Sequence, residues 1–169
     1  MTVSTRLITG LSALALAAVV PTTHAQAAQT TIQVNATVLK ALTFTAKQDL
    51  DFGTVVMSSA PGTFTVSMSL TGVVTCPAGY TCSGTPAPAI MNVTGSNGGI
   101  VQITALPSDL VNSADGTKIR FTPLTPATIT LTNSGNPGKD FNVGGSIAIP
   151  STATGGLYTG TVEVTVDYQ

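Results

Sequence analysis

The sequence predicts a single all-β domain, an immunoglobulin-like β-sandwich, behind an N-terminal export signal. After the first segment, no stretch keeps an apolar residue every three to four positions, so helices are not expected. Apolar β-branched residues instead alternate with Thr, Ser and other polar residues in about eight to ten short runs. Gly, Pro and Asn separate these runs about every 8–12 residues, which is a spacing typical of sandwich folds.

The first segment has the layout of a secretory signal peptide. Arg6 and the terminal amine supply positive charge, and an uncharged, mostly apolar run of fourteen residues from Leu7 to Val20 follows. A membrane anchor is the alternative, but a helix needs about 20 residues to cross the hydrocarbon core of a bilayer. We therefore predict that this segment is removed during export, and that the mature chain has no membrane span.

Small residues mark two cleavage positions, one after Ala25 and one after Ala27. The chain is accordingly divided into a signal peptide (1–25), an N-terminal extension or first strand (26–38) and a β-sandwich domain (39–169). Export predicts passage through the periplasm to the cell surface or the extracellular medium.

Charge is scarce in this chain. Charged residues make up 8% of the 169 residues and hydrophobic residues 43%, a balance opposite to that of disordered proteins. Beyond the signal peptide there are five basic and seven acidic residues, so the net charge is −2. So few cations make no basic patch, and a nucleic-acid partner is not expected.

Strands are predicted in order along the rest of the chain. The first alternation covers residues 30–38, and Leu42 with Phe44 continues an inward-facing pattern. Further strands are expected over residues 64–70, 100–106, 119–121, 129–131 and 141–149, the last kinked at Gly144-Gly145. The sequence Asn97-Gly98-Gly99, between two apolar runs, predicts a hairpin turn.

The last predicted strand has the strictest alternation. One of its faces carries Tyr158, Gly160, Val162, Val164, Val166 and Tyr168, and the other carries Thr, Glu and Asp side chains. A strand of this kind packs one face on a core and shows the other to water. We expect one continuous strand from Tyr158 to Tyr168.

The two cysteines, Cys76 and Cys82, flank a turn-rich segment. In an exported protein an even pair of this kind predicts a disulfide. The alternatives are a free thiol pair and a metal site, but a metal site would need His or further Cys residues, and the mature chain has neither. The bridge would close only a local loop.

The mature chain offers little to catalysis. It has no His, and Asp49 with Asp51 is its closest acidic pair. We expect these two side chains to lie on a solvated strand edge or turn rather than to form a catalytic dyad. The other Asp residues lack the spacing of a calcium-binding loop, although a weak calcium site in a loop stays open as an alternative. The prediction is a protein that is not an enzyme and that has no cofactor.

Three short motifs carry a resemblance to a known family. They are Asp49-Leu50-Asp51-Phe52-Gly53, Asn92-Val93-Thr94-Gly95, and Gly156-Leu157-Tyr158-Thr159-Gly160 followed by residues 162–169. Together they resemble a domain-of-unknown-function family of exported proteobacterial β-proteins. That family is similar to spore coat protein U domains and, more distantly, to chaperone–usher pilins.

Pilins carry a Gly about fourteen residues from the end and an aromatic penultimate residue, and Gly155 and Tyr168 fit this pattern. One departure is the cysteine pair, because many pilins bridge their first and second strands by disulfide.

The resemblance implies a pilin-type immunoglobulin-like sandwich that lacks one strand, whose groove is filled by a strand from a neighbouring subunit. The implied donor residues are Ile32, Val34, Ala36 and Val38. The implied groove edge, which a chaperone would also use, consists of Gly155, Tyr158, Gly160, Val162, Val164, Val166 and Tyr168. That residues 30–38 are the domain's own first strand remains the alternative.

The expected function is that of a non-enzymatic structural subunit of a surface fimbria or pilus-like polymer. Its expected partners are copies of itself or related subunits, a periplasmic chaperone and an outer-membrane usher. The alternative is a self-complete secreted β-sandwich that acts as an adhesin or as a matrix or coat component.

Overall fold

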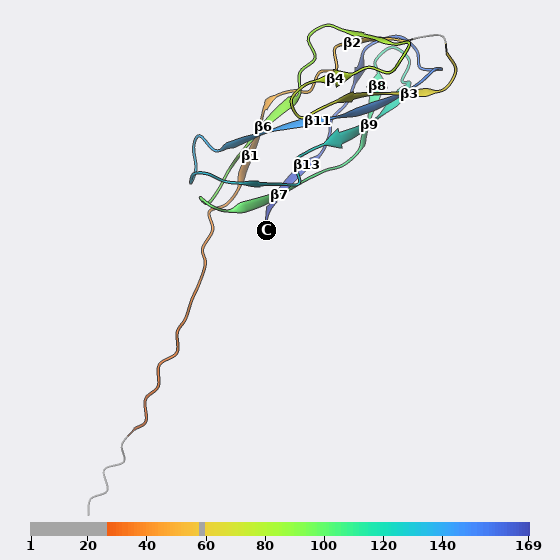
Figure 1. Ribbon diagram of the computed structural model, residues 1–169. Helices are drawn as coiled ribbons and strands as arrows, with labels where there is room; N and C mark the ends of the chain where they lie inside the picture. The colour runs from red at the N-terminus through yellow and green to blue at the C-terminus, as the bar shows by residue number, and fades with distance from the viewer. Residues whose placement is uncertain (1–26, 58–59) are drawn as a thin grey trace, which may run out of the picture. The chain divides into compact units, whose positions relative to one another are not determined.

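The computed structural model describes residues 27–57 and 60–169, and in these residues it contains strands and no α-helix (Figure 1). The predicted signal peptide (1–25) lies outside the described residues. The chain divides into two units, residues 1–36 and 37–169, and all the described strands belong to the second. The strands are β1 (Thr43–Gln48), β2 (Thr54–Val56), β3 (Thr63–Met68), β4 (Val74–Thr75), β5 (Thr81–Ser83), β6 (Ala89–Thr94), β7 (Ile100–Ala105), β8 (Ser108–Asn112), β9 (Lys118–Leu124), β10 (Thr128–Thr130), β11 (Lys139–Pro150), β12 (Tyr158–Thr159) and β13 (Val164–Tyr168). The predicted all-β class is confirmed.

The strands form one large, curled sheet and two small ones, and every pairing is antiparallel. The large sheet has eight strands in the order β1-β6-β11-β9-β8-β12, with β3 pairing β11 and β4 pairing β3. A three-stranded sheet has the order β10-β7-β13, and β2 pairs with β5. The immunoglobulin-like arrangement stays a prediction, because one curled sheet with two small sheets does not by itself define an immunoglobulin-like sandwich.

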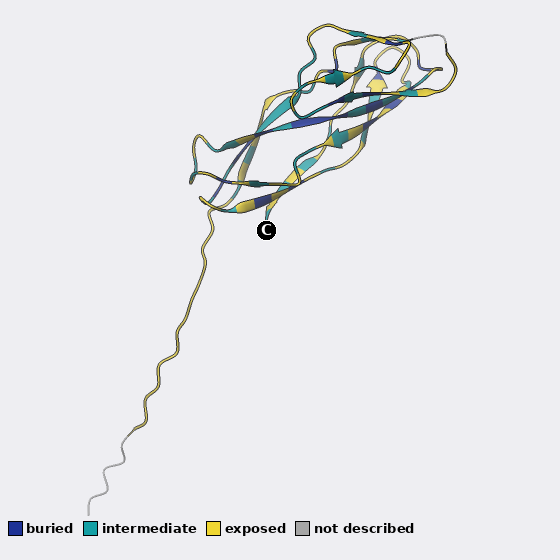
Figure 2. Ribbon diagram, in the orientation of Figure 1, coloured by how far each residue is buried: buried dark blue, intermediate teal, exposed yellow. Residues whose placement is uncertain are grey.

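Strand β11 is the centre of the large sheet. Its first half, residues 139–143, pairs with β6, and its second half lies between β3 and β9. Its alternate residues are buried, as Figure 2 shows by the dark blue along this strand. The change of partner falls at Gly144-Gly145, where the sequence predicted a kink. Strand β11 is therefore one strand whose two halves contribute to different parts of the core.

Two hydrophobic cores lie against β11. The first core consists of Phe52, Val66, Met68, Ile119, Phe121, Ile147, Ile149 and Ala153. The second core consists of Val93, Val101, Ile103, Leu131, Phe141 and Val143. Most of these residues come from the runs that the sequence predicted as strands, because alternation on a strand puts every second side chain on the buried face.

The Asn97-Gly98-Gly99 segment turns the chain, but the predicted hairpin is wrong. The Gly99 amide donates to the Ser96 carbonyl (3.0 Å). The strands on either side, β6 and β7, belong to different sheets. The turn residues fix the reversal of the chain, whereas burial of Val101 and Ile103 in the second core draws β7 away to pair with β10 and β13.

The continuous final strand is also corrected. Strand β12 pairs with β8 in the large sheet and β13 pairs with β7 in the small one, while residues 160–163 are in no strand. A ladder cannot follow two sheets at once, so it breaks where the chain passes between them. Gly160 marks the crossing, since a Cβ there would lie 2.7 Å from the Asp109 carbonyl oxygen.

A polar network joins β1, β6 and β11. The Lys47 ammonium donates to both carboxylate oxygens of Asp140 (2.8 and 2.9 Å). The buried Asn92 amide donates to the same carboxylate and to the Pro137 carbonyl (3.0 Å). The Lys47 hydrogen bond, and after it the Asn92 hydrogen bond, hold the pKa of Asp140 below its ordinary value.

This lowered pKa predicts a loss of stability in acid. A carboxyl whose pKa is lower in the folded than in the unfolded state, where it is about 3.9, stabilises the fold above that pH. The contribution disappears as the pH falls through the folded-state pKa. Asp140→Asn should therefore flatten the acid limb of a plot of urea midpoint against pH, and Asp167→Asn, on an exposed residue of β13, is the control. An acid limb as steep in Asp140→Asn as in the wild type would contradict the prediction.

Candidate functional site: an apolar groove

A cavity of about 670 Å³ opens in the strand-bearing unit. One wall is β1 with the segment after it, and the other wall is residues 153–164. The floor is apolar and comes from β9 and β11: Ile119, Phe121, Val143, Ile147 and Ile149. We call this cavity the groove.

Both walls contain strand edges. Among the described strands, β1 pairs only with β6, and β12 pairs only with β8. Each strand therefore leaves one side of its backbone outside any ladder, and such an edge is a template for an added strand. An apolar floor between two edges is an arrangement that can bind an extended, alternating peptide segment.

The structure brings five of the seven predicted edge residues together. Gly155, Tyr158, Gly160, Val162 and Val164 line the groove. Val166 and Tyr168 do not line it and instead pack against the second core. The lining of the groove on this side therefore ends at Val164, the first residue of β13.

The predicted donor residues lie outside every strand. The described residues before Thr43 form no strand, and the first strand of the structure begins there. Ile32, Val34 and Val38 are 83%, 84% and 89% exposed, and Ala36 is exposed as well. The alternating apolar face of residues 30–38 is thus not used in either core.

The other wall of the groove was not predicted from the sequence. Leu50, Phe52 and Val55 line it, together with the β1 residues Phe44 and Ala46. Leu50 and Phe52 belong to a motif that carried the family resemblance. The resemblance did not indicate that this motif would line the groove. Its alternation of apolar residues with Asp49 and Asp51 is the signal that could have predicted a half-buried wall.

The acidic pair sits at the rim of this wall. Asp49 and Asp51 are exposed, and the Asp51 carboxylate accepts a hydrogen bond from the Gly53 amide (2.7 Å). The Asp51 backbone forms a bridge with Ala87. In the described residues, no three His, Cys, Asp or Glu side chains come together as metal ligands.

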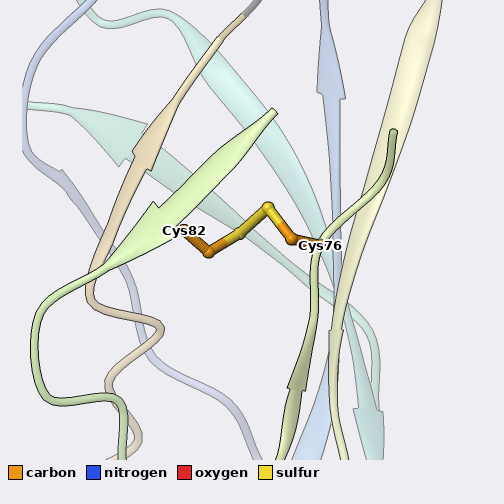
Figure 3. Close-up of a disulfide and its surroundings, with 2 residues drawn as sticks. All are labelled: Cys76 and Cys82. Carbon is orange, nitrogen blue, oxygen red and sulfur yellow. A yellow bond between two sulfur atoms is a disulfide. The ribbon is translucent and has the colours of Figure 1, made fainter. Parts of the chain in front are cut away.

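The disulfide between Cys76 and Cys82 is present, as predicted (Figure 3). Cys82 packs against the first core and lies opposite Val55 in the β2–β5 pair. Val55 lines the groove, so the bridge is connected to the groove wall through the β2–β5 pair. The loop that it closes spans a sequence separation of six residues.

Loss of this bridge should cost little. For a loop this short, the chain-entropy estimate is about 2 kcal/mol, at the low end of the about 2–5 kcal/mol typical of small secreted domains. The Cys76→Ser, Cys82→Ser double variant should stay folded, with its free energy of unfolding lowered by about 2 kcal/mol in urea titration. The wild-type protein should take up no alkylating label without reductant. A double variant that does not fold would contradict this prediction.

Comparison with known proteins places the chain in a family without assigning it a function. No curated protein and no solved structure matches it. In the described residues, no helix is long and apolar enough to cross a membrane. Residues 42–168, which hold every described strand and all the groove residues, match the model of a domain of unknown function, DUF4402. The resemblance seen in the motifs is confirmed at that level, and the chain belongs to the DUF4402 family.

Proposed function

We propose that this protein is a non-enzymatic structural subunit of a surface fimbria or pilus-like polymer, in which the groove of one copy receives residues 30–38 of another. The observation that carries the proposal is the apolar groove between the edges of β1 and β12. In this proposal the domain is a pilin-type immunoglobulin-like sandwich that lacks one strand.

The extension fits the groove in length and pattern. Residues 30–38 would extend about 30 Å as a strand. The first wall is not shorter than this segment, since its lining residues run from Phe44 to Met57. Ile32, Val34, Ala36 and Val38 would face the apolar floor, while Gln33, Asn35 and Thr37 would face water. One inserted strand would pair both edges and bury the exposed apolar side chains, at about 1.5–3 kcal/mol for each large one.

An unfilled groove also supports the expectation that a chaperone and an usher bind this protein. An exposed apolar stripe promotes association in a protein with only 8% charged residues. A periplasmic chaperone would cover the groove before assembly, and an outer-membrane usher would pass subunits to the growing polymer at the cell surface. Both partners follow from the proposal and from the predicted signal peptide.

The test is removal and return of the donor segment. A chain that lacks residues 26–38 should fold only with a chaperone or an added peptide of residues 30–38, and should not polymerise. With the peptide at 100 times its dissociation constant, the domain should gain about 2.7 kcal/mol. A peptide with Asp in place of Ile32 and Val34 is the control. A truncated domain that is stable, monomeric and indifferent to the peptide would contradict the proposal.

The second candidate is a self-complete exported β-sandwich that acts as an adhesin or as a matrix or coat component. The observation in its favour is that both cores form without the extension, with Val66 and Val93 fully buried. The mass of the full mature protein in size-exclusion chromatography separates the two: a ladder supports the polymer, and a lone monomer supports the self-complete domain.

A further inference from the structure

A closed ring of hydrogen bonds ties the start of the domain to its end. The Lys40 amide donates to the Ser96 hydroxyl (2.6 Å), and the Ser96 amide donates to the Tyr168 hydroxyl (2.6 Å). The Tyr168 hydroxyl donates in turn to the Lys40 carbonyl (2.8 Å). Both backbone polar groups of Lys40 are thereby occupied. We call these three residues the latch.

Packing reinforces the latch. The Tyr168 ring lies so close to Gly99 that a Cβ there would come within 2.8 Å of a ring carbon. Leu42 packs against the second core, and its side chain lies equally close to Gly95. Residues 40–42 are thus held against the turn between β6 and β7. The latch lies outside the lined part of the groove, because neither Lys40, Ser96 nor Tyr168 lines it.

The latch matters because a subunit's own extension is the natural competitor for its groove. A tethered segment reaches a millimolar effective concentration at a nearby site, well above that of a free neighbour at ordinary protein concentrations. To enter its own groove, the extension would have to fold back along β1 as a hairpin. The turn of that hairpin would fall on residues 39–42.

Two independent features oppose this turn. Lys40, in its middle, would have to give up both backbone hydrogen bonds of the latch. The segment Val38-Leu39-Lys40-Ala41-Leu42 also contains no Gly, Asn, Asp or Pro, the residues that tight hairpin turns require.

We infer that the Lys40–Ser96–Tyr168 latch excludes the protein's own extension from the groove and so reserves the groove for the extension of a second copy. The inference rests on the proposed function and adds the reason why assembly occurs between copies rather than within one. The latch residues are positioning residues, since they act on where the extension leaves the domain and not on the inserted strand.

The test is a cysteine pair in the full mature chain. Val34→Cys lies in the middle of the extension, and Ala46→Cys lies on β1 in the groove wall. Middle positions can meet whichever way the inserted strand runs. Oxidation followed by non-reducing electrophoresis separates bonds between copies, which give a ladder, from bonds within one copy, which give a cross-linked monomer.

The pair is combined with Tyr168→Phe, which removes the hydroxyl, and separately with Ser96→Ala, which removes the acceptor of the Lys40 amide. Each change deletes at least one hydrogen bond that holds Lys40, so the ratio of cross-linked monomer to ladder should rise about tenfold. Tyr80→Phe is the matched control. It removes a buried hydroxyl with no hydrogen-bond partner in the described part of the chain, on a residue outside the groove lining. Its ratio should equal that of the cysteine pair alone.

The outcomes separate the two proposals. A ladder with the latch intact and a cross-linked monomer in both latch variants supports the inference. The same ladder in all proteins, with circular dichroism showing the variants folded, overturns the inference and leaves the proposed function standing. A cross-linked monomer already with the latch intact overturns the inference, and no cross-link in any protein overturns the proposed function and the inference with it.

Discussion

Replacing Ile32 and Val34 by Asp should abolish assembly of the protein with itself without making the unassembled subunit less stable than the unassembled wild type. Both side chains are more than four-fifths exposed, so their replacement removes no packing from the unassembled subunit. In the assembled state each Asp would face the apolar floor formed by Phe121, Ile147 and their neighbours. Burying a carboxylate there without a partner is costly, and two apolar side chains are lost as well. The affinity between subunits should fall at least about 10³-fold, measured by light scattering across a concentration series.

A matched variant shows whether assembly is lost because of the strand face that carries the Asp residues or because of the added charge. Gln33→Asp with Asn35→Asp adds the same charge to the same segment, but on the face predicted to point to water. This variant should assemble as the wild type does. Equal loss of assembly in both variants would show that charge alone prevents association, and normal assembly of the Ile32, Val34 variant would contradict the donor-strand proposal.

The same variant has a second expected effect. Its groove is unchanged, so it should still accept the extension of a wild-type subunit but offer none of its own. Added to wild-type protein, it should shorten the polymers in proportion to its share of the mixture. A variant that leaves polymer length unchanged would indicate that its groove takes no part in assembly.

The sequence predicted best where a strand is buried on one face. Residues around Val66, Ile103 and Phe121 alternate strictly, and each lies in a strand of the structure. Alternation reports burial directly, because the side chains of a strand point to opposite faces in turn. The disulfide was predictable for a similar reason, since the two cysteines are close in sequence and each is the only possible partner of the other.

Pairing was predicted less well, since it depends on residues far apart in the chain. Residues 158–168 alternate without a break, yet the segment serves two sheets and leaves residues 160–163 in neither. Of the residues that line the candidate site, Tyr158, Gly160, Val162 and Val164 were named from this segment, and Gly155 from the pilin pattern. The opposite wall and the floor were not predicted. A groove forms where a strand edge has no neighbouring strand, and the local alternation of residues does not show which edges stay unpaired.

The largest loss of stability should come from Gly145→Ala. Gly145 lies where β11 exchanges β6 for β3 and β9, and its φ is +150°, a conformation that residues with a side chain rarely adopt. An added Cβ would lie 2.5 Å from the Thr122 carbonyl oxygen and 2.6 Å from a ring carbon of Phe121. Strand β9 would have to move away from β11, which opens the first core at its centre. The free energy of unfolding should fall by more than about 3 kcal/mol, a large share of the 5–15 kcal/mol of a typical domain.

Gly98→Ala is the control that separates the two causes. Gly98 also has a positive φ, +75°, but a Cβ there would meet no atom within 4 Å. Backbone strain alone should then cost about 1 kcal/mol. Urea titration of both variants, followed by circular dichroism, measures the difference, which should exceed about 2 kcal/mol because only Gly145→Ala drives β9 from its partner. Equal midpoints in the two variants would mean that the ladder around β11 can relax around a methyl group, and that this strand is not the rigid centre of the domain.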